Sequence, residues 1–424
     1  MNVYLETFGC TFNQADSQIM VGLLREDGVK LVNNPLEADV IIINTCYVKH
    51  PTEQKVVNRI QKLQEKFPNK KLLITGCMVE IDQAKLLKHA PHASWLGPHQ
   101  IKHTSQAVKS ILNGENVKLT GSNKAIKVCL PKVRSNPYIH IIQICEGCDG
   151  ACSYCCTRFA RGKLQSYPED LIRFEADKAI HDGCMELQLT AQDTAAYGKE
   201  TGESLAHLIN QVTGVEGDFR VRVGMMHPKS ILNDVDGIIN SFQNEKVYKF
   251  LHIPIQSGND NVLIDMNRGY KLKDFRNIIT QLREEIPEIS VATDVIVGYP
   301  TEDEQSFQDT LELIKDVKPD FLHISKYHHR PGTPSSILDE IDHHIMKNRS
   351  KMLNELKTGI SLHNNQKLVG TIQKILITDK GSKGGFMGRT GNYKTVIVDD
   401  APLGCFVETE IIEAKSTYLK GRLL

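Results

Sequence analysis

Short apolar runs alternate with amphipathic helical patterns over the first part of the chain. Three runs are rich in β-branched residues, a composition typical of strands, and they lie at 2–8, 38–44 and 71–75. Residues 14–26 and 52–66 carry apolar positions at helical spacing, and Pro51 stands where the second helix would begin. The order strand, helix, strand, helix, strand predicts a parallel sheet of βαβ units in a first domain at residues 1–112.

The same alternation resumes further along the chain, where six runs have strand character and helical patterns lie between them. These runs are 138–144, 185–189, 219–223, 249–255, 289–297 and 321–325. Six strand and helix pairs fall short of the eight that close a full barrel. The pattern alone therefore predicts a second α/β domain over residues 138–364.

After residue 364 the hydrophobic pattern changes to a period of two. Strands are expected at 370–378, 394–398 and 406–412, and glycines punctuate the stretches around them. This pattern predicts a small β-barrel of the OB type at residues 365–424, an architecture that often binds oligonucleotides.

Residues 113–137 have no clear periodicity, and they are expected to form a linker. Their basic residues are Lys118, Lys124, Lys127, Lys132 and Arg134. A solvated basic connector is the first interpretation, and contact with RNA phosphates is the second.

Composition limits the partners and the cellular compartment that are expected for the protein. The 424 residues include 51 Lys plus Arg and 51 Asp plus Glu, so no global field would attract nucleic acid or a membrane. The eleven cysteines accompany an amino terminus without a secretory signal, which favours reduced thiols in the cytoplasm. No stretch approaches the roughly 18 apolar residues of a membrane helix, and no membrane contact is expected.

The sequence CEGCDGACSYCCTRFARG at 145–162 carries the strongest chemical signal. Cys148, Cys152 and Cys155 stand in a C-x3-C-x2-C spacing, which places three thiolates on one short loop. Three ligands for a four-iron cluster leave one iron open to a small molecule. Cys145 and Cys156 keep an alternative open, a four-ligand zinc or ferredoxin-type site, although Cys145 fits better as the end of the preceding strand.

This loop resembles the cluster loop of radical S-adenosylmethionine (SAM) enzymes, and Tyr154 supplies the aromatic residue of their signature. The flanking Glu146-Gly147, Arg158, 160–162 and Leu164 resemble the methylthiotransferase family more closely than the superfamily at large. The resemblance implies a partial (β/α)6 barrel for residues 138–364, with its chemistry at the carboxyl ends of the strands.

Three further cysteines each follow one of the first three strands: Cys10, Cys46 and Cys77. Because parallel strands end at a common edge, these thiols are expected to converge, although each one alone reads as a small buried hydrophobe. The stretches TFGCTFNQADS, NTC and TGC resemble the amino-terminal methylthiotransferase domain. That resemblance implies a second, auxiliary 4Fe-4S cluster on these three cysteines, again with one open iron.

Other strand ends carry polar residues that resemble family strings and are expected to hold SAM. Together with Tyr154, the candidates are Gln192, Asp193, Gln256, Ser257, Gly258 and Asp294. Each group of polar residues is weak evidence alone. Because such groups recur at several strand ends, they predict a rim that binds the cofactor and the substrate.

The string GRTGNYKTV near the carboxyl end resembles the TRAM domain, an RNA-binding module. From residue 366 onward there are nine Lys or Arg and six Asp or Glu, so this segment is net positive by three. The expected RNA contacts are Arg389 and Lys394 there and Arg158 and Arg161 in the cluster loop, with surface solubility as the competing interpretation.

The resemblance covers nearly the whole chain and implies a tRNA methylthiotransferase with two 4Fe-4S clusters and SAM. The run at 158–168 is similar to archaeal and eukaryotic-type members, which act on N6-threonylcarbamoyladenosine at position 37 beside the anticodon. Eukaryotic relatives carry a carboxy-terminal membrane anchor, and a chain ending at Leu424 favours the archaeal-like form. An external electron donor is also expected, while the oligomeric state stays open.

Three alternatives remain at this point. The acceptor is isopentenyladenosine in some family members and a ribosomal-protein aspartate in others. A non-catalytic iron–sulfur RNA-binding protein is the alternative from a different class.

Overall fold

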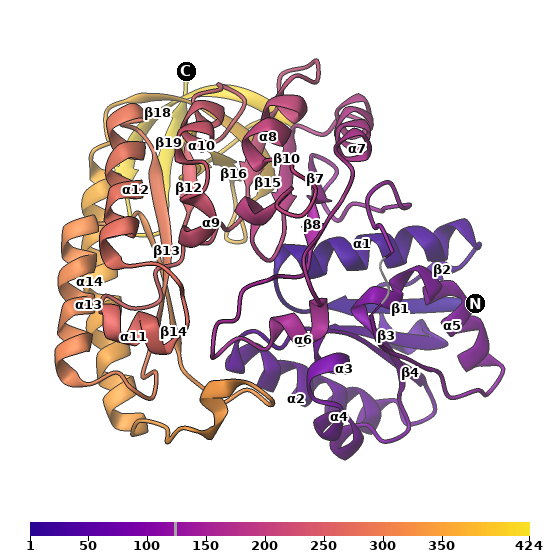
Figure 1. Ribbon diagram of the computed structural model, residues 1–424. Helices are drawn as coiled ribbons and strands as arrows, with labels where there is room; N and C mark the ends of the chain where they lie inside the picture. Colours follow the sequence, from indigo (N-terminus) through magenta and orange to yellow (C-terminus); the bar gives the residue numbers. More distant parts are fainter. Residues whose placement is uncertain (123–124) are drawn as a thin grey trace.

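The computed structural model describes residues 1–122 and 125–424 (Figure 1). Lys124, one of the basic residues of the expected linker, lies outside the described residues. The amino-terminal unit, the central barrel and the small carboxy-terminal barrel follow one another along the chain, as predicted.

The amino-terminal unit is a parallel sheet of six strands in the order β2-β1-β3-β4-β5-β6. The strands are β1 (Asn2–Thr7), β2 (Lys30–Leu31), β3 (Val40–Thr45), β4 (Lys71–Gly76), β5 (Ser94–Leu96) and β6 (Lys118–Leu119). The helices are α1 (Thr11–Glu26), α2 (His50–Lys66), α3 (Cys77–Ile81), α4 (Gln83–His89) and α5 (Thr104–Leu112).

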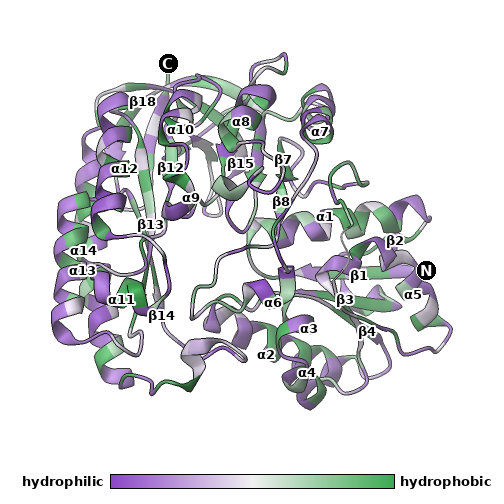
Figure 2. Cartoon of the chain, in the orientation of Figure 1, coloured by the Kyte–Doolittle hydropathy of each residue, from purple (hydrophilic) through white to green (hydrophobic). Residues whose placement is uncertain are grey.

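Both faces of this sheet are buried, because successive side chains of a strand point to opposite sides. Val40 and Ile42 pack with residues of α1 and α5, whereas Ile41 and Ile43 pack with residues of α2 and α4. Figure 2 shows the resulting apolar colouring of β3 and β4 between more hydrophilic helices.

The segment at 113–137 is more than the expected linker. Strand β6 lies inside it and pairs with β5, so the sheet continues past the predicted boundary at residue 112. Lys127 and Lys132 are buried in ion pairs instead of being solvated. A two-residue edge strand has no periodicity that a sequence pattern could reveal.

The central unit contains the six predicted parallel strands as two sheets, β11-β10-β7 and β12-β13-β14. Their bounds are β7 (Ile139–Gln143), β10 (Glu186–Thr190), β11 (Arg220–Val223), β12 (Phe250–His252), β13 (Ser290–Val297) and β14 (Phe321–Lys326). A parallel bridge between Val221 and Val247 joins the two sheets. The result is the partial barrel that the family resemblance implied.

Helices cover the outside of the barrel, and shorter elements lie at its ends. The longer helices are α7 (Glu169–His181), α8 (Leu205–Thr213), α10 (Val235–Phe242), α12 (Leu272–Glu285), α13 (Glu304–Val317) and α14 (His343–Gln366). The shorter elements are β8 (Cys145–Glu146), β9 (Gln165–Ser166), α6 (Thr157–Arg161), α9 (Pro228–Ile231) and α11 (Asp260–Asp265).

The amino-terminal unit contacts both edges of the open barrel. On one side, Gln143 of β7 donates to the Asp16 carboxylate of α1 over 2.8 Å. On the other side, Arg330, just after β14, donates to Glu53 of α2 and to the carbonyl of Val48. The barrel opening is therefore bounded by two domains.

The carboxy-terminal unit is a closed barrel in the order β15-β16-β17-β19-β18. The strands are β15 (Ile372–Lys380), β16 (Phe386–Arg389), β17 (Thr395–Val398), β18 (Cys405–Ala414) and β19 (Leu419–Leu423). Three of them were predicted. Strands β16 and β19 were missed because Gly388 and Gly421 interrupt their alternation.

This small barrel docks at the amino ends of the central strands, opposite the cluster loop. The Tyr393 ring lies 4.8 Å from the Tyr248 ring and 5.0 Å from the Phe250 ring, centroid to centroid. The Lys394 ammonium lies 2.6 Å from the Asp320 carboxylate. None of the described helices is long and apolar enough to cross a bilayer.

Candidate active site

Cys148, Cys152 and Cys155 lie on the loop between β8 and α6, at the carboxyl edge of the barrel. The loop starts at Gly147, whose φ of +87° suits glycine, and a Cβ there would come 2.1 Å from the Lys163 carbonyl oxygen. The Gly147 N–H donates to Gln192 Oε1 over 2.7 Å. Glycine and Gln192 together therefore fix the entry to the loop.

Two N–H donors already point at sulfur atoms of this trio. The backbone N–H of Gly150 lies 3.2 Å from Cys148 Sγ, and Arg268 Nη1 lies 3.4 Å from Cys152 Sγ. Burial raises the pKa of Cys148 to about 11 and also raises the pKa of Cys155. Burial therefore disfavours a free thiolate, whereas the N–H donors suit a sulfur whose negative charge a bound metal would share.

The two flanking cysteines do not complete a four-ligand set. Cys145 is fully buried in the barrel core, and its thiol donates to the Asp193 carbonyl at 3.8 Å. Cys156 is buried among residues of the amino-terminal core that include Cys77. The structure therefore favours the three-ligand reading over the zinc or ferredoxin alternative.

The second trio forms where three strands of the amino-terminal sheet end. Cys10 is the N-cap of α1, Cys46 follows β3, and Cys77 begins α3 directly after β4. A Cβ on Gly9 would fall 2.5 Å from Cys46 Cβ, so the first two loops touch. Burial first, and then the neighbouring Cys77 and Cys10, raise the pKa of Cys46 to about 12. The predicted convergence is confirmed.

Neither trio, as the described residues lie, is arranged around a single metal ion. Among residues 1–122 and 125–424, no three His, Cys, Asp or Glu side chains lie close enough together to hold a single metal ion. A 4Fe-4S cluster binds each thiolate through a different iron, so its ligands stand further apart than those of one ion. Both trios are compatible with that arrangement.

Arg161 links the two cysteine regions. Its guanidinium lies 2.7 Å from Asp16 and 2.8 Å from Glu146, and Lys127 also bonds both carboxylates at 3.0 and 2.9 Å. Arg161 is only 1% exposed, so the predicted RNA contact at this residue is wrong. We call Asp16, Lys127, Glu146 and Arg161 the junction network. Its two cations balance its two carboxylates.

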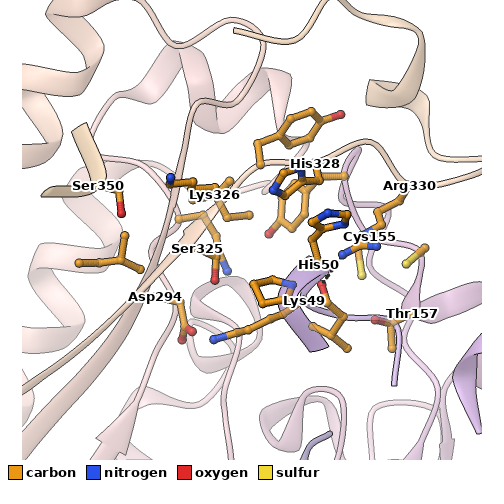
Figure 3. A pocket seen from close by; sticks show the side chains of 18 residues that line it. Lys49, His50, Cys155, Thr157, Asp294, Ser325, Lys326, His328, Arg330 and Ser350 are labelled. Atoms are coloured by element: carbon orange, nitrogen blue, oxygen red, sulfur yellow. Dashed lines mark hydrogen bonds between the residues drawn. The ribbon is translucent and has the colours of Figure 1, made fainter. Parts of the chain in front are cut away.

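A cavity of about 460 Å³ lies between the cluster loop, the barrel edge and the start of α2, and we call it the chamber (Figure 3). Its walls include Cys155 and Cys156 of the cluster loop and the segment at 48–51, which follows Cys46. The His50 and His328 rings stack at 4.2 Å between centroids, one from each domain. The chamber is therefore closed by both cysteine-bearing units.

Three predicted cofactor residues line the chamber: Tyr154, Gln256 and Asp294. Gln256 has a φ of +76°, unusual for a residue with a side chain, and its buried Oε1 has no hydrogen-bond partner. Asp294 bonds His252 Nε2 at 2.6 Å. Burial alone would raise the pKa of Asp294, but the hydrogen bond and charge of His252, followed by His323 and Lys49, lower it.

The other predicted cofactor residues lie in supporting positions. Gln192 holds Gly147, and Asp193 is buried, where it accepts from the His227 N–H and the Ser230 hydroxyl. Gly258 packs against α13, and the buried Ser257 hydroxyl oxygen accepts from the Asn259 N–H, so neither residue lines the chamber. A Cβ on Gly258 would come 2.4 Å from Thr310 Cα, so glycine is needed there for close packing. A position at a strand end therefore did not distinguish residues that line the chamber from residues that support its walls.

The carboxy-terminal RNA contacts are also revised. Lys394 is 4% exposed and paired with Asp320, so this prediction is wrong, because the loop docks onto the central barrel. Arg389 is half-buried and bonds the Thr395 hydroxyl and the Tyr393 carbonyl. Arg158 on α6 is exposed and stays a candidate for phosphate contact.

Sequence reasoning missed several residues around the site. Arg268 bonds Cys152, Tyr154 and the Pro254 carbonyl, although no motif marked it. Lys49 and Lys326 line the chamber and were not singled out. Nothing in the sequence around Arg330 predicted its ion pair with Glu53 across the domains.

Comparison with known proteins covers all three units. The Uncharacterized protein family UPF0004 matches residues 2–97, the Radical SAM superfamily matches 142–314, and the TRAM domain matches 366–424. Among solved structures, the radical SAM methyltransferase TsrM from Kitasatospora setae aligns with a TM-score of 0.58 at 12% identity, over 79% of this chain and 77% of that one. This likeness concerns the fold.

Curated relatives extend over the whole chain. The probable threonylcarbamoyladenosine tRNA methylthiotransferase of Methanothermobacter thermautotrophicus is 57% identical over 419 residues, 99% of each chain. Its counterpart in Pyrococcus horikoshii is 38% identical over 427 residues, 100% of each chain. The threonylcarbamoyladenosine tRNA methylthiotransferase of Homo sapiens is 34% identical over 99% of this chain and 73% of its own length. The chain therefore belongs to the threonylcarbamoyladenosine tRNA methylthiotransferase family.

Proposed function

We propose that this protein converts N6-threonylcarbamoyladenosine at position 37 of tRNA, beside the anticodon, to its 2-methylthio derivative. One observation carries the proposal: a single chamber is lined both by Cys155 of the cluster loop and by the segment at 48–51, which follows Cys46 in the amino-terminal unit. The relatives with this function match the chain from end to end.

The family's cofactors are two 4Fe-4S clusters and SAM, and the cysteines fit the clusters. Cys148, Cys152 and Cys155 would hold one cluster, and Cys10, Cys46 and Cys77 would hold the other. With SAM, they would supply a 5′-deoxyadenosyl radical and a methylthio group, chemistry outside the side-chain repertoire. An external electron donor is required.

The chain itself positions the reacting groups. Gln192 and Arg268 fix the cluster loop from two sides, and the junction network joins that loop to α1. Arg330 ties the end of β14 to Glu53 at the start of α2. These contacts hold the cluster loop and the start of α2 against one cavity, which shortens the search for a reactive geometry.

The RNA backbone would remain outside the chamber while the modified base enters it. We assign Arg158, exposed on α6, to phosphate contact, with half-buried Arg389 as the carboxy-terminal candidate. Tyr154, Gln256 and Asp294 are the chamber residues proposed to contact SAM.

Anaerobically reconstituted protein, SAM and a reductant should be incubated with three anticodon stem-loops that carry threonylcarbamoyladenosine, isopentenyladenosine or plain adenosine. Nucleoside mass spectrometry should find the methylthio product in the first RNA only. Product in the isopentenyl RNA alone would assign that alternative. SAM cleavage without any RNA product would point to another acceptor such as a protein aspartate, and no cleavage would favour the non-catalytic alternative.

A further inference from the structure

The chamber wall carries more positive than negative side chains. Its lining contains three permanent cations, Lys49, Lys326 and Arg330, and one carboxylate, Asp294. Arg330 is paired with Glu53, and Asp294 is bonded to His252. Within the described residues, neither the Lys49 nor the Lys326 ammonium group forms an ion pair or a hydrogen bond.

The two unpaired ammonium groups belong to different domains. Lys49 directly precedes α2, and Lys326 ends β14. Figure 3 shows both side chains in the cavity wall, with Lys49 reaching toward Asp294. Lys49 is within electrostatic reach of Asp294, His323 and Lys357, so its surroundings include a further cation. A cavity with this surplus attracts an anion.

The substrate named by the relatives carries such an anion. A threonylcarbamoyl group ends in the α-carboxylate of threonine, whereas an isopentenyl group is neutral and apolar. A carboxylate that enters a partly closed cavity needs a cationic partner to offset its lost hydration. An apolar group would instead desolvate the two ammonium groups without compensation, which selects against it.

We propose that Lys49 and Lys326 together bind the carboxylate of the threonylcarbamoyl group and thereby set the substrate specificity of the chamber. This assignment rests on the proposed function. The site is complete only when the amino-terminal unit is docked on the barrel, because each domain contributes one ammonium group. Recognition of the substrate carboxylate therefore depends on the docking of the two domains against each other.

Two other anions could use the same lysines: the carboxylate of SAM and a phosphate of the RNA backbone. The test therefore measures holoenzyme binding to three stem-loops that carry threonylcarbamoyladenosine, its neutral carboxamide analogue or plain adenosine. It also measures the KM for SAM. The variants are Lys49→Gln, Lys326→Gln and the double variant.

Lys347→Gln is the matched control, because Lys347 is an exposed lysine one helical turn before Ser350 on α14 but is not part of the chamber wall. It reports the general effect of losing one positive charge from the protein surface.

The wild-type protein should bind the threonylcarbamoyl RNA about tenfold or more tightly than the carboxamide RNA, as expected for a charge-assisted bond. The double variant should lose this difference and keep its affinity for the plain RNA, while Lys347→Gln keeps the difference.

Equal weakening for all three RNAs would assign the lysines to phosphate, and a raised KM for SAM with unchanged RNA affinities would assign them to SAM. Either result, or an unchanged double variant, overturns the proposal. If the wild-type protein forms no methylthio product on the threonylcarbamoyl RNA, the proposed function itself fails, which is a separate outcome.

Discussion

The basic side chains of the junction network are paired with carboxylates, whereas two of the chamber lysines are not. In the junction network, Arg161 and Lys127 are almost fully buried, and both are bonded to Asp16 and Glu146. In the chamber, the exposed Lys49 and Lys326 line the cavity, and neither ammonium group forms an ion pair or hydrogen bond with a described carboxylate. Cations at the first place hold domains together, whereas cations at the second place remain available to a ligand.

Substitution of a basic residue should therefore have a different effect in each of the two regions. Buried ion pairs contribute little net stability compared with apolar packing, yet removal of one partner leaves an uncompensated charge. Loss of a junction cation should therefore damage the fold. Loss of a chamber cation should spare the fold and change binding.

The largest effect on stability is expected for Arg161→Met. This change leaves two buried carboxylates to share Lys127, and the free energy of unfolding should fall by about 4 kcal/mol. Urea unfolding of the cluster-free protein measures it. Arg158→Met on the same short helix removes an exposed guanidinium and should cost less than about 0.5 kcal/mol. Similar losses in both variants would contradict the distinction.

A smaller effect should appear in acid through Glu175, which holds the segment around Lys132 against the barrel. Burial alone would raise the pKa of Glu175, but Lys132 and His140 hold it down at about 2. Since the folded pKa lies below the unfolded value of about 4.3, the stabilisation is present above that pH and is lost as the pH falls toward 2.

Unfolding of the cluster-free protein by urea between about pH 5 and pH 2 should therefore show a loss of about 3 kcal/mol from this group. Glu175→Gln should be less stable at neutral pH and should lack this part of the pH dependence. An unchanged pH slope in the variant would show that other carboxyls are responsible.

Lys394→Met should lower the free energy of unfolding less than the loss of Glu175 does, but more than a chamber substitution. The reason is that the Asp320 partner is 11% exposed and retains some hydration. We expect a loss of about 2 kcal/mol, and the additional change Asp320→Asn should restore most of it. Affinity for tRNA should be unchanged in both variants. A selective loss of RNA affinity with normal stability would restore Lys394 as a phosphate contact.

The smallest effect on stability is expected in the chamber. Lys49→Gln and Lys326→Gln should each change the free energy of unfolding by less than about 0.5 kcal/mol, because no described partner is lost. The same urea titrations measure this. A loss of several kcal/mol would show that these lysines are structural, and the contrast between the two regions would disappear.

The sequence predicted the architecture well because β-branched runs and helical spacing mark buried elements directly. The three strand-end cysteines were predicted to converge for a topological reason, since parallel strands end at one edge. The missed strands β16 and β19 contain glycine, and β6 has only two residues. Their pairing depends on neighbours that lie elsewhere in the chain.

The roles of single basic residues could not be predicted in the same way. Arg158 and Arg161 are three positions apart on α6, yet only Arg161 meets Asp16 from another domain. Lys394 meets Asp320 for a similar reason. Such partners are set by tertiary packing, so local sequence does not distinguish a buried cation from a ligand-binding one.

The central claim is that two separate cysteine trios hold two clusters beside one chamber. Iron analysis with Mössbauer spectroscopy tests it most directly, on wild-type protein and on the triple variant Cys10→Ala, Cys46→Ala, Cys77→Ala. We predict about eight irons per chain in the wild type and about four in the variant, which should still cleave SAM. Eight irons in the triple variant, or a variant with four irons that no longer cleaves SAM, would contradict the account.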